Sequence, residues 1–193
     1  MKNIALRIIA ATIIIGALAG CRNHRKAGAA PPEPEAETVL TAIDRFLTDS
    51  IAPSYLQGKY CIPFCDYIHT DESDPDNICV LGDFWVFNYE QAGDTLKCVS
   101  GGNHSGKMMI KKDAEGHFSV VSFEQTTDGS DAEPSARRIF GDKYDEFAAA
   151  NSNSIERDQI RADAIAGYVK RNQIPVSLYQ DFGWPAIEIP KAE

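Results

Sequence analysis

The cysteines carry the most reactive side chains in this chain of 193 residues. They are Cys21, Cys61, Cys65, Cys79 and Cys98. If the Cys21 thiol is consumed by another modification, an even number of thiols remains. An oxidising compartment would then favour two disulfides with three possible pairings. A hairpin turn over residues 70–77 would bring Cys65 near Cys79 on the neighbouring strand. We therefore predict a Cys65–Cys79 disulfide, and the remaining two thiols would form a Cys61–Cys98 disulfide. A four-thiolate zinc site and free buried thiols are the alternatives, although the spacing lacks the paired C-x-x-C units that such zinc sites favour.

The turn predicted over residues 70–77 is rich in carboxylates, which are ligands that calcium prefers. Its acidic residues are Asp71, Glu72, Asp74 and Asp76. Their order does not match an EF-hand loop and lacks its distal glutamate, so we predict a solvated turn and no metal or other cofactor. His69 beside the turn could bind a metal or transfer protons, but a single histidine is more often a surface or packed residue.

A glycine-rich stretch over residues 101–107 fits the pattern G-x-x-x-x-G-K of a phosphate-binding loop. Met108 follows where such a loop needs serine or threonine to hold magnesium. The next segment has the pattern of a strand, so no helix N-terminus would face the phosphates. We therefore interpret the stretch as a hairpin turn between two strands.

No recognisable catalytic motif surrounds the serines, cysteines and histidines. The chain contains no G-x-S-x-G elbow, and His69, His104 and His117 are scattered over predicted strand ends and turns. We assign no catalytic residue. The enzymatic alternative is a hydrolase or isomerase that uses a pocket carboxylate such as Asp83 with a nearby histidine.

The N-terminal residues have the pattern of a signal peptide. Lys2 and Arg7 precede an apolar run over residues 8–15, and small residues follow it. A bilayer needs about 20 apolar residues for one crossing, so this run is too short to span it and indicates a cleaved segment over residues 1–20.

The signal peptide pattern ends in Leu18, Ala19, Gly20 and Cys21, a sequence that resembles the lipobox of bacterial lipoproteins. The resemblance implies that a diacylglycerol is added to the Cys21 thiol, that a peptidase cuts before it, and that the new N-terminus is acylated. Two or three acyl chains would tether the protein firmly to a membrane without spanning it. Residues 22–26 are basic and no acidic pair follows Cys21 closely, which favours the periplasmic face of the outer membrane within the cell envelope.

The remaining chain divides into a tether and one domain. Residues 21–36 are rich in proline, alanine and glutamate and contain no large apolar residue, which predicts a flexible spacer. Residues 37–193 suit a single globular domain. Removal of residues 1–20 leaves 17 of the 19 basic residues against 28 acidic ones, a net charge of −11. Because such a surface repels phosphate backbones, we expect no nucleic-acid partner.

Hydrophobic periodicity predicts an α+β domain: a curved antiparallel meander packed on an N-terminal helix, with two additional C-terminal helices. The first helix is predicted over residues 37–51. The first strand is predicted over residues 60–68, and its Pro63 indicates that it lies at the edge of the sheet or contains a bulge. The runs 78–81 and 84–87 are apolar on both faces, which predicts a central strand covered on each side. Later strands are predicted over residues 95–100, 107–112 and 117–124, helices around residues 139–148 and 154–169, and an aromatic tail over residues 176–185 that packs back on the sheet.

The order of elements resembles the cystatin-like and NTF2-like folds, in which a curved antiparallel sheet wraps a helix. This resemblance covers residues 37–125 and implies no single function, because those folds include enzymes, binding modules and inhibitors. We expect a non-catalytic binding or scaffolding module whose partner is a protein or a small apolar ligand. Trp85, Phe87, Met108 and Phe123 are the candidates for a pocket on the concave side of the sheet, and they can equally be core residues.

Overall fold

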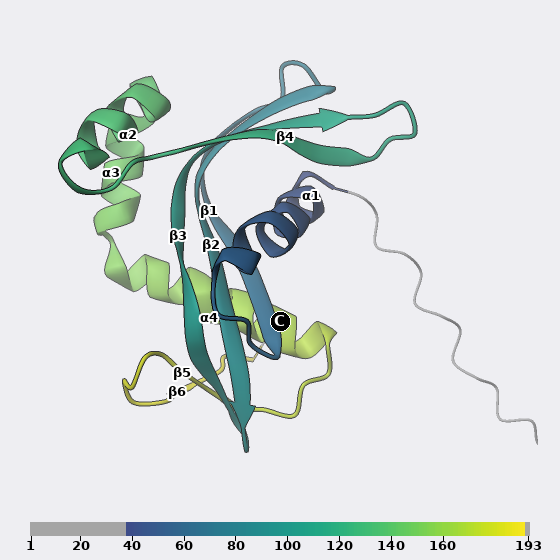
Figure 1. The fold of residues 1–193 in the computed structure, drawn as a ribbon, viewed down its shortest axis with the longest axis vertical. Coiled ribbons are helices and arrows are strands. Elements are labelled where there is room, and N and C mark those ends of the chain that lie inside the picture. The colour runs from purple at the N-terminus through teal and green to yellow at the C-terminus, as the bar shows by residue number, and fades with distance from the viewer. Residues whose placement is uncertain (1–37, 192–193) are drawn as a thin grey trace, which may run out of the picture. The chain divides into compact units, whose positions relative to one another are not determined.

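The computed structural model describes residues 38–191. The predicted signal peptide, Cys21 and the spacer lie outside the described residues. The described part contains one curled sheet with helices on both of its faces (Figure 1). This arrangement confirms the predicted α+β class.

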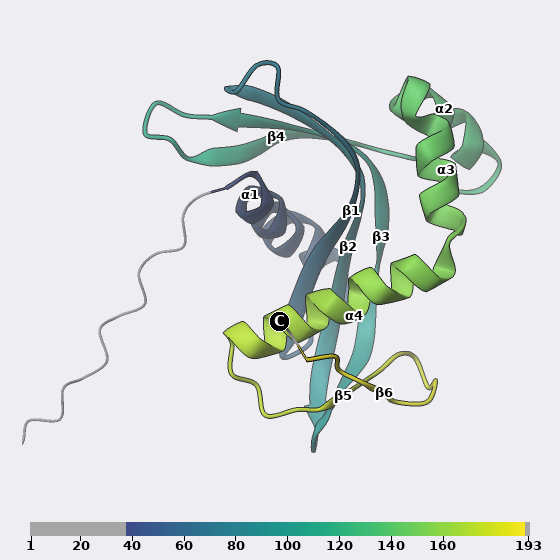
Figure 2. The same cartoon turned by 180° about the vertical axis from the view of Figure 1, so that it is seen from behind.

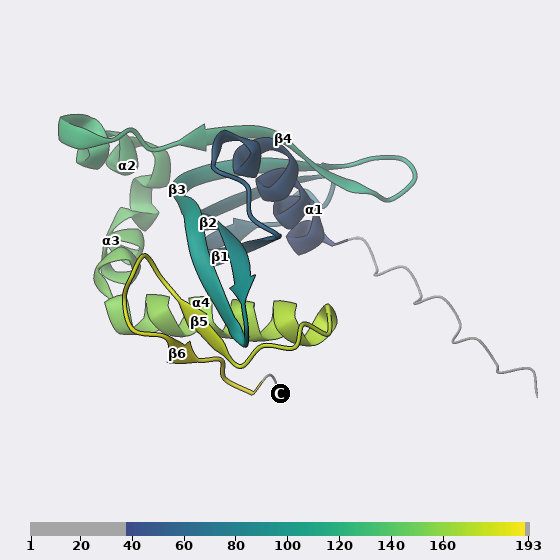
Figure 3. The same cartoon turned by 60° about the horizontal axis from the view of Figure 1, so that its bottom comes forward.

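The sheet is built on three long strands in hairpin order. These are β1 (Tyr60–Asp71), β2 (Asn77–Ala92) and β3 (Thr95–Lys112). The end of β3 pairs antiparallel with β4 (Phe118–Gln125), and its beginning pairs parallel with β5 (Leu178–Gln180). The short strand β6 (Ile187–Glu188) then pairs antiparallel with β5 at the edge. The aromatic tail therefore extends the sheet, and Figure 3 shows β5 and β6 beside α4.

Helices cover opposite faces of the sheet. α1 (Val39–Phe46) continues through a π-helical turn, Leu47–Ile51, so this helical segment ends at the predicted residue, and a 3-10 turn, Ala52–Ser54, follows it. After β4 come α2 (Ala132–Phe140), α3 (Tyr144–Ser152) and α4 (Ser154–Arg171). The first predicted C-terminal helix thus comprises α2 and α3, which are separated by a short 3-10 turn at Gly141. α1 lies on one face of the sheet and α4 on the other (Figure 2).

β2 is the central strand of the core, and alternate side chains point to its two faces. Val80 and Phe84 join a cluster that α1 covers, whereas Trp85 and Phe87 join a cluster that α4 covers. Phe84 is fully buried and Trp85 is 6% exposed. The prediction of a strand covered on both faces is confirmed. Pro63 lies in β1 at the edge of the sheet, also as predicted.

The prediction of a hairpin turn over residues 101–106 is wrong, because β3 runs through these residues without interruption. A Cβ atom on Gly101 would lie 2.3 Å from the Val86 carbonyl oxygen, and one on Gly106 would lie 2.3 Å from the Glu124 carbonyl oxygen. Glycine here permits close approach of neighbouring backbones. The same glycines that suggest a turn in the sequence allow one long curved strand in the structure.

We expect Gly101→Ala to destabilise the domain by about 2 kcal/mol or more, because Gly101 has φ of 143° and no room for a Cβ atom. The free energy of unfolding in urea measures this. The matched control is Gly167→Ala within α4, where the added methyl group meets only the Arg171 guanidinium at 3.4 Å. The control should stabilise α4 slightly, since alanine favours helices. Equal stability of the two variants would contradict the close-approach interpretation.

Candidate functional site

The register of the sheet separates the first predicted pair of cysteines. Cys65 lies opposite Phe84, whereas Cys79 lies opposite Asp71, six residues further along β1. Six residues of a strand span about 20 Å, but a disulfide requires Cα atoms within about 7 Å. The Cys65–Cys79 pairing therefore does not fit this structure. The predicted turn after β1 is present, but the strands it joins are longer and differently aligned than that pairing requires.

The second predicted disulfide, Cys61–Cys98, does not fit the structure for a similar reason. Cys61 lies opposite Asn88 and Cys98 lies opposite Tyr89, so β2 stands between the two thiols. Two strand spacings amount to about 9.6 Å, which is also too far for a disulfide. The four thiols of the described chain are free, and burial raises the pKa of each, that of Cys98 to about 11. Within residues 38–191, no group of three or more histidine, cysteine or acidic side chains is placed to hold a metal ion.

The expected pocket residues do not converge on a cavity. Trp85 and Phe87 pack under α4, whereas Met108 and Phe123 belong to the cluster that contacts α1 on the other face. Trp85 and Phe87 are almost fully buried and Met108 is completely buried. The structure thus gives these side chains the role of core residues, and α1 fills the concave side of the sheet.

Asp83 is a buried carboxylate with an arginine partner. The Arg157 guanidinium on α4 donates to Asp83 Oδ2 at 2.8 Å, and Ser105 Oγ donates to Oδ1 at 2.6 Å. The indole of Trp85 also donates to Oδ2, and the guanidinium of Arg157 lies 4.3 Å from the centre of that indole ring. The partners of this carboxylate in the described residues include no histidine. His104 instead contacts Tyr55 and Gln125. Asp83 therefore serves to join α4 to the sheet.

A second arginine repeats this arrangement one helical turn later. Arg161 donates from Nη2 to Asp181 Oδ1 at 2.6 Å and to the Tyr89 hydroxyl at 2.9 Å. Its guanidinium also lies 4.0 Å from the centre of the Phe87 ring. Because Asp181 follows β5, this contact fastens the C-terminal strands to α4 as well as to β2.

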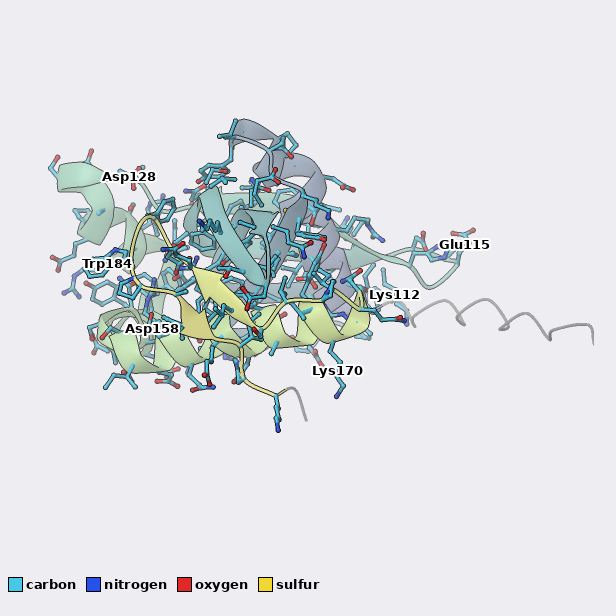
Figure 4. The ribbon with its side chains drawn as sticks, turned by 90° about the horizontal axis from the view of Figure 1, so that it is seen from below. Lys112, Glu115, Asp128, Asp158, Lys170 and Trp184 are labelled. Atoms are coloured by element: carbon cyan, nitrogen blue, oxygen red, sulfur yellow. The ribbon has the colours of Figure 1, made fainter. Side chains whose placement is uncertain are left out.

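A large open cavity lies beside Arg161, between α4 and the segment that joins β5 to β6. Its volume is about 570 Å³, which is within the usual range for ligand sites. A second cavity of about 350 Å³ adjoins it. Asp158, Tyr179 and Ile187 line both cavities, so the two form one groove. We call this the α4–β6 groove, and its principal residues are Ile155, Asp158, Arg161, Phe182, Trp184 and Ile187. Figure 4 shows Asp158 and Trp184 on the same side of the molecule.

A tight turn positions the aromatic side chains of the α4–β6 groove. The Trp184 amide donates to the Asp181 carbonyl at 2.7 Å, and the two residues between them have positive φ: 39° at Phe182 and 84° at Gly183. Positive φ at both central residues is typical of a type I′ turn. The Gln180 side chain also donates to the Trp184 carbonyl at 2.7 Å. The turn thus has internal support, although the ring of Phe182 and the indole of Trp184 are largely exposed to solvent.

The rim of the groove is unusually apolar for a surface. Trp184 is 71% exposed, Phe182 60%, Ile187 52% and Ile155 83%. Single exposed apolar residues are common, but a contiguous group around a cavity indicates an interaction site. The one signal for this site in the sequence is a C-terminal tail rich in aromatic residues.

The groove has a negative electrostatic character. Burial raises the pKa of the Asp181 carboxyl; the Arg161 cation opposes this rise and the charge of Asp158 adds to it. Burial likewise raises the pKa of Tyr179, with Asp181 and Asp158 both contributing and Arg161 opposing. Since Arg161 is paired with Asp181, Asp158 has no ion-pair partner within residues 38–191 and adds a negative charge to the wall of both cavities.

In comparisons with known proteins, the chain matches no family model, no curated protein and no solved structure. Within residues 38–191, no helix combines the length and the apolar character that a membrane crossing requires.

We expect Arg157→Met to destabilise the domain by about 3–5 kcal/mol, because it leaves the Asp83 carboxylate buried without its cation. The double variant Asp83→Asn, Arg157→Met should lose less than the sum of the single variants, since it removes both charges. Urea unfolding of the full cycle measures this coupling. Arg137→Met is the matched control, because it removes an exposed ion pair with Glu133 and should cost far less. Additive single effects would argue against a buried ion pair between α4 and the sheet.

Proposed function

We propose that this protein is a lipid-anchored protein of the bacterial cell envelope whose folded domain is a non-catalytic binding module. The observation that carries the binding role is the α4–β6 groove, where Phe182, Trp184 and Ile187 are exposed around cavities of ligand size. Exposed aromatic rings with large contact areas are typical of recognition surfaces. The groove therefore binds the ligand or partner of this module.

The interior of the domain supports binding rather than catalysis. The carboxylate that would be the first choice for acid–base chemistry, Asp83, is held by Arg157, Trp85 and Ser105. A general base needs hydrogen-bond access to its substrate, and this carboxylate is only 1% exposed. The concave side of the sheet is occupied by α1, so the ligand is bound on the opposite side, next to α4.

The N-terminal region supplies the membrane attachment in this proposal. Cys21 carries the acyl chains, residues 21–36 form a spacer, and the domain extends from the periplasmic face of the outer membrane. The acyl chains give lasting attachment, because each buried methylene contributes about 0.8 kcal/mol. The binding groove then operates at a fixed membrane surface.

Lipidation predicts that the mature protein begins at Cys21 and that its thiol carries a thioether-linked diacylglycerol. Mass spectrometry of the N-terminal peptide from the native protein measures both properties. In Cys21→Ala, the leader should remain uncut, because the modified thiol is the signal for cleavage in the lipoproteins that this sequence resembles. An unmodified thiol at Cys21, or residues 1–20 still attached in the wild-type protein, would refute the anchor.

Binding in the groove predicts that Trp184→Ala reduces ligand capture from envelope fractions by tenfold or more. That loss is equivalent to at least about 1.4 kcal/mol. The side chain is 71% exposed, so the variant should keep the stability of the wild type. Quantitative mass spectrometry of the bound material measures the effect. Leu56→Ala is the matched control, because Leu56 is also 71% exposed and lies outside the groove. Equal capture by Trp184→Ala and wild type would place binding elsewhere.

A further inference from the structure

The shape of the α4–β6 groove suits an extended chain. Its two cavities, of about 570 and 350 Å³, meet at Ile187, and Asp158 lies on the wall of both. In an extended peptide, side chains at alternate positions lie on one face and are about 6.6 Å apart. Such a peptide therefore presents two side chains on one face, one for each of the two adjoining cavities.

The charges of the groove select the side chains of that peptide. Asp158 is exposed and belongs to no ion pair among residues 38–191, whereas Asp181 is neutralised by Arg161. Glu188 adds a second acidic side chain at the smaller cavity. The groove thus combines an excess of negative charge with exposed aromatic rings, and this combination is complementary to a cationic side chain next to an apolar one.

The turn that presents the aromatic rings is conformationally costly. Phe182 has φ of 39°, a region that bulky residues rarely adopt, and yet its ring is 60% exposed and contributes little to the core. An outlier of this kind is typical of functional sites, where the surrounding structure imposes the strained conformation. This observation is independent of the charges and places a strained residue on the rim of the groove.

We propose that the α4–β6 groove binds an extended segment of a partner protein in which a lysine or arginine lies two positions from a large apolar residue. The apolar side chain enters the larger cavity against Trp184, and the cation pairs with Asp158. This inference rests on the proposed binding function and names its ligand class. An anionic membrane surface is a poorer occupant, because Asp158 and Glu188 would face its head groups.

Fluorescence titration tests the inference directly. The chain has two tryptophans, of which Trp85 is 6% exposed and Trp184 is 71% exposed, so a ligand in the groove changes the emission of Trp184. The probe is a capped peptide in which a leucine and a lysine lie two positions apart, within an otherwise alanine and serine sequence. The comparison peptide is identical except that its lysine is acetylated. We expect the acetylated peptide to bind wild type about two- to fivefold more weakly, as for an exposed charge pair.

Asp158→Asn should remove this preference for lysine, whereas the matched control Asp163→Asn should retain it. Asp163 lies on the same helix but lines neither cavity. Three outcomes overturn the inference: no saturable signal up to about 1 mM of peptide, the dissociation constant of a very weak complex; equal binding of both peptides; or an undiminished preference in Asp158→Asn. Binding of phosphatidylglycerol vesicles that depends on Trp184, without binding of the peptide, would instead identify a membrane as the occupant. Capture that depends on Trp184 in envelope fractions would keep the proposed function even if the peptide inference failed.

Discussion

Two arginines that are one helical turn apart fasten α4 to the sheet, and the groove depends on them. Arg157 and Arg161 lie four residues apart on the helix, which places their side chains about 6 Å apart. Trp85 and Phe87 lie two residues apart on β2, at nearly the same spacing. Each guanidinium therefore rests on one aromatic ring and pairs with one carboxylate. The helix cannot shift along the strand without breaking both contacts.

This fastening gives the two faces of the sheet different roles. The face toward α1 is filled by apolar side chains, and the cavity between α1 and β4 measures only about 180 Å³, below the usual range for ligand sites. The other face carries α4. Arg161 on this helix pairs with Asp181, which links α4 to the C-terminal strands. The proposed recognition surface thus forms at the outer edge of the domain, where the turn after β5 exposes Phe182 and Trp184.

The sequence predicts those features whose cause is local. The periodicity of residues 37–51 is sufficient for α1, and Pro63 identifies an edge strand because proline cannot donate a ladder hydrogen bond. Features that depend on distant partners cannot be predicted in this way. The glycines at 101 and 106 are equally suited to a turn or to close strand packing, and only the neighbouring strands decide between them. Arg157 and Asp83 lie 74 residues apart in sequence, so nothing local indicates their contact. The α4–β6 groove is not predicted from the sequence, because the aromatic residues of the C-terminal tail are expected to pack in the core.

The parallel pairing of β5 with β3 has a consequence for the order in which the domain is assembled. Ser177 precedes β5 and Asp94 precedes β3. The Ser177 hydroxyl donates a hydrogen bond to Asp94 Oδ2 across 83 residues of sequence. Closing a loop of this length carries an entropic cost that local hairpins avoid. The meander of β1 to β4 can form from neighbouring segments, whereas the wall that carries Trp184 must wait for this late closure. A chain folding from the unfolded state would therefore acquire its central sheet before it acquires its capacity for recognition.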